Sequence, residues 1–165
     1  MKAVLFVGGW EGHAPMDFAD WYRDLLESNG FEAVVHDTLE PLEHPEDMAD
    51  VDLITPIWSS ARSGHQEEFG NMTKRQEDGL LKLIGDGCGL AGWHGHMGDA
   101  FRDRPTYHFL IGGQFVAHPP GWPDNLQPRE DYIDYDVTIC QPDHPLVEGI
   151  RSFRITSEQY YMLTD

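Results

Sequence analysis

The pattern of apolar and polar positions divides the first half of the chain into short strands and two amphipathic helices. Apolar runs at residues 2–7, 31–36, 51–57 and 88–93 are short, which is typical of buried strands. One helical face follows the first run, with apolar side chains at the i, i+3, i+4, i+7 and i+8 positions Phe18, Trp21, Tyr22, Leu25 and Leu26. A second helix is expected after Thr73, because residues 73–76 have the form of a capping box, and it should end at residues 85–87. The order β-α-β-β-α-β predicts a mostly parallel, doubly wound α/β sheet with helices on both faces.

The pattern is less regular in the second half of the chain. Alternation at residues 132–140 predicts a half-exposed edge strand, and residues 153–156 a further short one. Asp143-His144-Pro145 predicts a turn and a short helix, with His144 holding the turn. Pro56, near the end of the third apolar run, favours a strand end over a central ladder position. The length suits one domain over residues 1–165, and because the chain stops directly after an aromatic run, we expect a C-terminal portion to be missing.

The charge of the chain restricts its partners. Asp and Glu number 29 against 11 Lys and Arg, a net charge of −18, which disfavours nucleic acid and anionic membranes as partners. No apolar run approaches the roughly 18 residues that cross a bilayer, and no secretory signal or disulfide framework is evident, so we expect a cytoplasmic protein. Only three of the basic residues are lysines, which is typical of adaptation to high salt, although an ordinary acidic enzyme is an equal alternative. A homo-oligomer is compatible with these features.

Tryptophan and histidine follow the predicted strands at the places where open parallel sheets bind ligands, beyond the carboxyl ends. Trp10 and His13 follow the first strand, Trp58 follows the third, and residues 93–99 follow the fourth. The rings of Trp10, Trp58 and Trp93 suit stacking on a sugar, so we expect a polar organic ligand in a crevice. The glycine pair at residues 8–9 lacks the dinucleotide fingerprint, so NAD is weakly supported.

The segment from Gly92 to Asp99 is the strongest candidate site. Its glycines allow a sharp strand-to-helix turn like a nucleophile elbow, with His94 in the place of a reactive Ser or Cys. Covalent acyl chemistry is therefore disfavoured, and an imidazole suits general acid/base work or metal ligation. We expect Asp99 to cap the next helix or orient a histidine, and Cys88, at the start of its strand, to be a buried thiol.

Further candidates lie downstream in irregular, aromatic segments. His118 and Glu158 could act in catalysis with His94, and Gln114 and Tyr160 could bind hydroxyl groups together with His13. His13, His94, His118 and Glu158 could also supply nitrogen and oxygen ligands to a divalent metal such as Zn²⁺. Because none has a tight ligand spacing, metal binding and metal-free acid/base chemistry both stay open. The histidines without such context, which we expect to be surface or structural residues, are His36, His44, His65 and His108.

These motifs, in this order and over almost the whole chain, resemble the trehalose-utilisation (ThuA-like) family. The matching stretches are Gly8-Gly9-Trp10-Glu11-Gly12-His13, Gly92-Trp93-His94-Gly95-His96-Met97-Gly98-Asp99-Ala100-Phe101-Arg102, Gly112-Gly113-Gln114-Phe115-Val116-Ala117-His118-Pro119, Asp143-His144-Pro145 and Glu158-Gln159-Tyr160-Tyr161. The resemblance implies a three-layer, flavodoxin-like fold of the class I glutamine amidotransferase type, without that enzyme's catalytic cysteine. His96 departs from the family pattern, which has glycine there, so the site geometry differs at this position.

The resemblance also implies a role in carbohydrate metabolism. We expect an enzyme that acts on a disaccharide or keto-sugar by histidine acid/base or metal-assisted chemistry, with a small carbohydrate as its partner. A non-catalytic sugar-binding or regulatory domain is the main alternative. A glutamine amidotransferase is disfavoured by the missing cysteine, and flavodoxin-like FMN binding would give a yellow protein.

Overall fold

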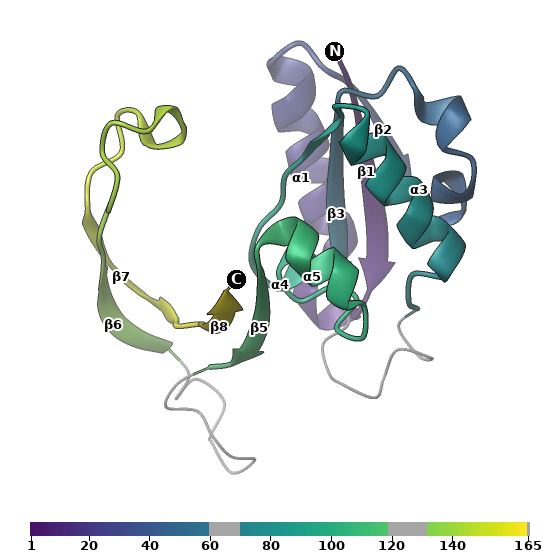
Figure 1. Ribbon diagram of the computed structural model, residues 1–165. Helices are drawn as coiled ribbons and strands as arrows, with labels where there is room; N and C mark the ends of the chain where they lie inside the picture. Colours follow the sequence, from purple (N-terminus) through teal and green to yellow (C-terminus); the bar gives the residue numbers. More distant parts are fainter. Residues whose placement is uncertain (60–69, 119–131, 165) are drawn as a thin grey trace. The chain divides into compact units, whose positions relative to one another are not determined.

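Four parallel strands form a sheet in the order β2-β1-β3-β4, the arrangement of flavodoxin-like folds (Figure 1). The strands are β1 (Lys2–Gly9), β2 (Glu32–His36), β3 (Leu53–Ser59) and β4 (Gly89–Leu90). The computed structural model describes residues 1–59, 70–118 and 132–164. These residues form two units, Met1–Gln114 with Thr164 (the first unit) and Phe115–Leu163 (the second unit). The sheet belongs to the first unit and confirms the predicted α/β class.

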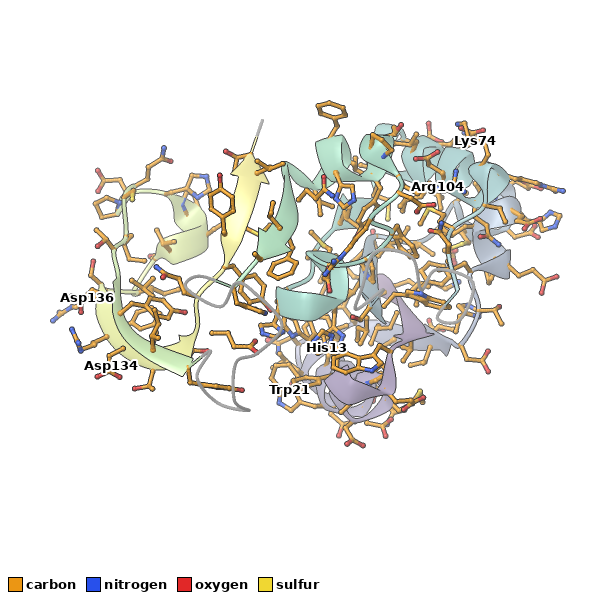
Figure 2. All side chains as sticks on the ribbon, turned by 90° about the horizontal axis from the view of Figure 1, so that it is seen from below. His13, Trp21, Lys74, Arg104, Asp134 and Asp136 are labelled. Atoms are coloured by element: carbon orange, nitrogen blue, oxygen red, sulfur yellow. The ribbon has the colours of Figure 1, made fainter. Side chains whose placement is uncertain are left out.

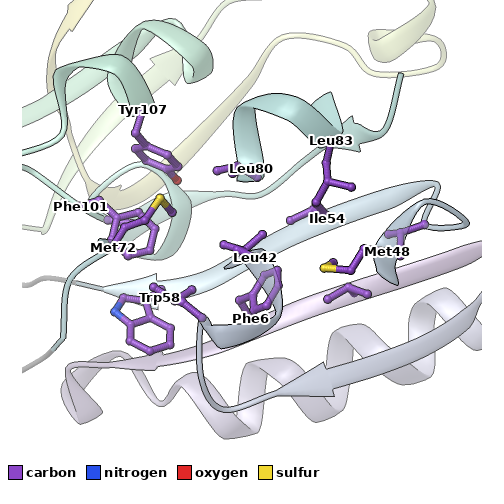
Figure 3. Close-up of a cluster of buried hydrophobic side chains, with 14 residues drawn as sticks. Phe6, Leu42, Met48, Ile54, Trp58, Met72, Leu80, Leu83, Phe101 and Tyr107 are labelled. Carbon is purple, nitrogen blue, oxygen red and sulfur yellow. The ribbon is translucent and has the colours of Figure 1, made fainter. Parts of the chain in front are cut away.

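The sheet is buried on both faces because alternate side chains of its central strands enter two separate cores. Val4 and Phe6 of β1 pack with α3 (Lys74–Gly85) and with the 3₁₀ helices η2 (Glu40–Glu43) and η3 (Pro45–Met48), as Figure 3 shows for Phe6, Leu42 and Leu80. Ala3, Leu5 and Val7 face the other way and pack against α1 (Pro15–Ser28). Helices thus cover both faces, as predicted for a three-layer fold.

The two main helices differ in how well the sequence predicts them. The capping box of α3 forms in full, with the Thr73 hydroxyl accepting from the Gln76 N–H and the Gln76 side chain accepting from the Thr73 N–H. In α1 the buried face is rotated from the predicted one, because it contains Ala19 and Leu26, whereas Phe18, Trp21 and Leu25 are more than a third exposed. The small side chain of Ala19 lets α1 lie close to the strands. The bulky rings of Phe18 and Trp21 then lie at the edge of the buried face and stay partly exposed.

Two strand predictions need correction. The fourth strand is shorter than residues 88–93, because pairing with β3 covers only Gly89–Leu90 and ends with the bond from the Ala91 N–H to the Ile54 carbonyl. Pro56 does lie inside β3, paired with β1, rather than at a strand end. The backbone hydrogen-bonding groups of alternate residues in a strand face the same neighbouring strand. The backbone nitrogen of Pro56 therefore faces the β4 side, as the carbonyl of Ile54 does, but it lies past the last hydrogen bond between β3 and β4. No ladder hydrogen bond is lost there.

The remaining elements are short. In the first unit, α4 (His94–Met97) and α5 (Pro105–Ile111) follow β4. The strands β5 (Gly113–Ala117) and β8 (Tyr161–Thr164) pair with each other, and β6 (Tyr132–Val137) pairs antiparallel with β7 (Phe153–Glu158). The predicted strands at 132–140 and 153–156 are therefore present with shifted ends.

In the second unit, polar side chains stabilise the turn at residues 143–145 and the two-stranded ribbon of β6 and β7. His144 caps the 3₁₀ helix η4 (Pro145–Val147) by accepting from the Leu146 N–H, which confirms its predicted role in the turn. On the ribbon, Arg154 of β7 contacts both Asp134 and Asp136 of β6, which Figure 2 labels.

Among the described residues, no helix has the length and apolar character needed to cross a membrane.

Candidate functional site

The carboxyl ends of β1 and β3 meet where the strand order reverses, the point at which flavodoxin-like sheets bind ligands. The Trp10 N–H donates to the Ser59 carbonyl at 3.0 Å, so the chain leaves β1 while still tied to β3. Gly9 permits this approach: its φ is +85°, and a Cβ there would lie 2.7 Å from the Ser59 nitrogen and closer to its carbonyl oxygen. The turn leads into the 3₁₀ helix η1 (Glu11–His13), which ends with His13 at the start of α1 (Figure 2).

His13 is held from three sides. Its Nδ1 lies 2.8 Å from the hydroxyl of Ser59, whose side chain is fully buried. The Trp10 ring meets the imidazole edge-on at a centroid distance of 4.8 Å. On the third side, a Cβ on Gly95 would lie 2.8 Å from both ring nitrogens, so the imidazole fits only because residue 95 has no side chain.

The predicted elbow is present after β4. Trp93 is extended, and His94 then adopts a φ of +50°, a left-handed conformation that is uncommon for a residue with a Cβ. Helix α4 begins at His94, so the turn from strand to helix is as sharp as the glycine pattern predicts. The His94 imidazole lies 5.7 Å from that of His13, ring centre to ring centre.

His96 completes a group of three imidazoles, here called the histidine cluster (His13, His94 and His96). Its ring lies 5.8 Å from that of His13 and is 2% exposed, enclosed by Phe18 at 5.1 Å and Trp93 at 5.7 Å. Burial, and then the neighbouring His13 and His94, lower the pKa of His96 to about 4. Its Nδ1 is buried with no hydrogen-bond partner in the described parts of the chain. His96 is therefore a neutral imidazole at pH 7.

The three tryptophans predicted as stacking walls differ in exposure. Trp10 is 39% exposed beside His13, and Trp93 is half-buried between α1 and His96. Trp58 is only 8% exposed and packs against Phe101 within the core (Figure 3). Its ring lies so close to Gly8 that a Cβ there would be 2.7 Å from it. Stacking on a sugar stays a prediction for all three, and burial disfavours it for Trp58.

Two other expectations around the elbow have different outcomes. Asp99 pairs with Arg102, and the N-cap residue of α5 is Arg104. Within the described residues, Asp99 therefore does not cap that helix, and its side chain bonds to an arginine instead of a histidine. The arginine provides the charge that a nearly buried carboxylate requires. Cys88 is half-buried, and burial raises the pKa of its thiol, with Asp52 adding to the effect. That agrees with an inert thiol.

A second polar group lies in the second unit. The His118 Nδ1–H donates to the Gln159 carbonyl at 3.1 Å, and its Nε2 lies 4.0 Å from a Glu158 carboxylate oxygen. The rings of Phe115 and Tyr160 lie 4.9 and 4.8 Å from the His118 imidazole. The structure thus brings together the predicted residues His118, Glu158 and Tyr160.

The predicted residues therefore fall into two groups. His13, His94, Trp10 and Trp93 gather in the first unit, to which the half-buried Gln114 of β5 also belongs. The four-residue metal set is divided, because His118 and Glu158 lie in the second unit. Across residues 1–59, 70–118 and 132–164, no three His, Cys, Asp or Glu side chains are arranged to hold a metal ion. The metal stays a prediction from the sequence.

Sequence reasoning missed the roles of Ser59 and His96. The signal for Ser59 was its place directly after the third strand, at the reversal of strand order. His96 was visible as a departure from the family pattern, but its burial depends on Phe18, which lies on a different element.

Comparisons with known proteins agree with this fold. The sequence profile of the ThuA family, described as trehalose utilisation, matches residues 2–165. A solved ThuA-like protein from Bacteroides uniformis ATCC 8492 has a similar structure, with a TM-score of 0.69 at 18% sequence identity. The similarity covers 97% of this chain and 60% of that protein, so this chain spans well under two thirds of its length. No functionally curated protein matches the chain.

Proposed function

The chain belongs to the trehalose-utilisation (ThuA) family, and from that premise we propose that it is an enzyme of carbohydrate metabolism. It acts on a disaccharide or a keto-sugar by histidine acid/base chemistry. The observation that supports this proposal is the histidine cluster at the carboxyl ends of the strands, where His13 and His94 lie 5.7 Å apart beside the neutral His96.

The three imidazoles have different environments and hence different tasks. His94, at the elbow, is the principal acid/base: it removes a proton from the sugar, and the same imidazole returns one later in the cycle. His13 serves as its partner, since a second imidazole nearby can donate to an oxygen while the first accepts a proton. His96 is buried and neutral, so it packs beside His13 without adding a positive charge to the cluster.

A keto-sugar suits this arrangement for a chemical reason. A carbonyl group acidifies the hydrogens on the adjacent carbon, and a positioned base can remove them. His94 would act on that hydrogen while His13 hydrogen-bonds the carbonyl oxygen as charge develops on it. Trp10, beside His13, and Trp93, beside His96, would stack on the sugar rings.

The pair of His118 and Glu158 is an imidazole with a carboxylate beside it, a second possible acid/base group. We propose it as a separate candidate acid/base group of the second unit. Its contribution is measured separately through His118→Ala, so that its failure leaves the proposal for His94 intact.

The experiment follows a panel of disaccharides and their oxidised keto derivatives by NMR. Positioned acid/base groups contribute about 10²–10⁴-fold, so His94→Ala should lower turnover by at least about 100-fold. His44→Ala is the matched control, since the His44 side chain is exposed and lies beside Glu46, an exposed carboxylate. Unchanged turnover in His94→Ala would contradict the proposed mechanism.

A non-catalytic sugar-binding domain is the second candidate, favoured by the exposed Trp10 ring beside His13. Binding alone needs the stacking surface more than it needs proton transfer. Under this alternative, Trp10→Ala weakens sugar affinity much more than His94→Ala does, and no sugar in the panel is converted.

A further inference from the structure

We infer that the backbone carbonyl of Gln159 holds His118 with a hydrogen on Nδ1, so that Nε2, the nitrogen on the side of Glu158, is the atom that accepts a proton. Gln159 acts here through its backbone, as a positioning residue. What this base acts on rests on the proposed function, but the form of the His118 ring can be measured without any substrate.

The hydrogen bond to Gln159 determines which ring nitrogen carries the hydrogen. Nδ1 of His118 lies 3.1 Å from the Gln159 carbonyl oxygen, within the range of N–H···O hydrogen bonds. A carbonyl oxygen has no hydrogen to give, so Nδ1 must be the donor. A neutral imidazole carries a hydrogen on one nitrogen only, and Nε2 therefore presents a lone pair that can accept a proton.

The surroundings of His118 keep the ring in this orientation. His118 directly follows β5, and Gln159 lies just before β8, so the pairing of these two strands brings the residues together although they are 41 positions apart in the sequence. The rings of Phe115 and Tyr160 lie 4.9 and 4.8 Å from the imidazole, centre to centre. Turning the His118 ring over would put a carbon against the carbonyl and lose the hydrogen bond.

The other nitrogen of His118 is placed for proton transfer. Nε2 lies 4.0 Å from a Glu158 carboxylate oxygen, which is beyond hydrogen-bond distance, and the His118 side chain is 26% exposed. When Nε2 takes a proton from an O–H group of a bound molecule, the ring becomes a cation and that oxygen becomes an anion. The Glu158 carboxylate favours the cation by Coulomb attraction. The Gln159 carbonyl thus orients the ring and Glu158 stabilises its charge, two tasks that the aspartate of a serine-protease triad performs alone.

The test is ¹⁵N NMR of the full chain labelled at histidine, recorded at about pH 9, where imidazoles are neutral, with the ring signals assigned by His118→Asn. A neutral hydrogen bond gives a preference of about 2- to 10-fold, so the ratio of the Nδ1–H form to the Nε2–H form should be higher by that factor in the folded chain than in urea. Gln159→Ala is the matched control, because it keeps the carbonyl and removes only an exposed side chain, and it should retain the ratio. Glu158→Gln should retain it too.

Two spectra would overturn the inference: a ratio no higher in the folded chain than in urea, or a ratio that falls to the urea value in Glu158→Gln, which would make the carboxylate the orienting group.

Turnover of the sugar panel tests Nε2 separately. The amide of His118→Asn can still donate to the Gln159 carbonyl but replaces only Nδ1, so activity should fall as far as in His118→Ala. Wild-type turnover in His118→Asn together with a loss in His118→Ala would reduce His118 to a structural role and contradict proton transfer at Nε2. Failure of the proposed function has a different signature, because the His118 ring would then have the expected form in a protein that converts no sugar.

Discussion

Adding one methyl group at Gly95 should separate the stability of the protein from the function of its histidine cluster. A Cβ at this position would lie 2.8 Å from both nitrogens of the His13 ring, whereas ordinary contacts begin at 3.4 Å. The Cε1 atom of the ring would lie closer still, so the ring must move by about 1 Å. The hydrogen bond to Ser59, now 2.8 Å, cannot keep its geometry through such a shift unless the neighbours move too.

The effect of Gly95→Ala on stability should be moderate, because the favourable contribution of Ala offsets part of the unfavourable ones. Weakening one neutral hydrogen bond costs about 0.5–1.5 kcal/mol. Replacing Gly by Ala at a compatible helical position contributes up to about 1 kcal/mol in the other direction. The backbone of Gly95 meets this condition, since it lies in α4 and does not have a positive φ. The added Cβ also displaces the packed His13 ring, which costs about 1–3 kcal/mol. Urea unfolding should therefore show a loss of no more than about 3 kcal/mol.

The effect on function should be large by comparison. Misplacing a reacting group by about 1 Å can cost on the order of 100-fold in rate, so turnover should fall by 10- to 100-fold. Gly85→Ala is the matched control: it ends α3, a Cβ there meets nothing within 4 Å, and it should stabilise the protein slightly at full activity. Wild-type turnover and unchanged His13 NMR signals in Gly95→Ala would refute the packing argument.

Three further predictions concern stability. Thr73→Ala removes the capping box of α3 and should lower the free energy of unfolding by about 1 kcal/mol, and a loss under 0.3 kcal/mol in urea unfolding would contradict its role. Because the pKa of His96 is lowered to about 4, the unfolded chain binds more protons below pH 6.5, so stability should fall as the pH drops from 6.5 to 4. His96→Phe should reduce that loss, by up to about 3 kcal/mol, and an identical pH dependence would count against the buried neutral imidazole. Finally, the melting temperature should rise from low salt to about 1 M NaCl as the repulsion within a chain of net charge −18 is screened, and highest stability at low salt would contradict the high-salt interpretation.

The parts of the fold that local patterns determine were predictable from the sequence. The capping box at Thr73 needs only residues three positions apart, and the buried strands follow from short apolar runs. The end of β4 was not predictable, because it depends on where β3 stops pairing. The buried face of α1 was misassigned for a related reason: hydrophobic spacing favoured Phe18 and Trp21, while close packing favoured Ala19.

The candidate site was predictable only to the level of the elbow. Glycines around His94 indicated the sharp turn, and its positive φ confirms it. Ser59 could not be paired with His13, because 46 residues separate them and only the parallel pairing of β1 with β3 brings them together. The sequence likewise contained no sign that the histidines would fall into two groups, in different units of the chain.

The exchange of hydrogen between solvent and a keto-disaccharide tests the central claim most directly. The sugar is incubated in D₂O with the wild type, His94→Ala or the His44→Ala control, and NMR follows the hydrogen next to the carbonyl. If His94 removes that proton, the wild type and the control should exchange or convert the sugar, with His94→Ala slower by at least about 100-fold. Equal rates in all three proteins, or no exchange with a folded wild type, would contradict histidine acid/base chemistry at this site.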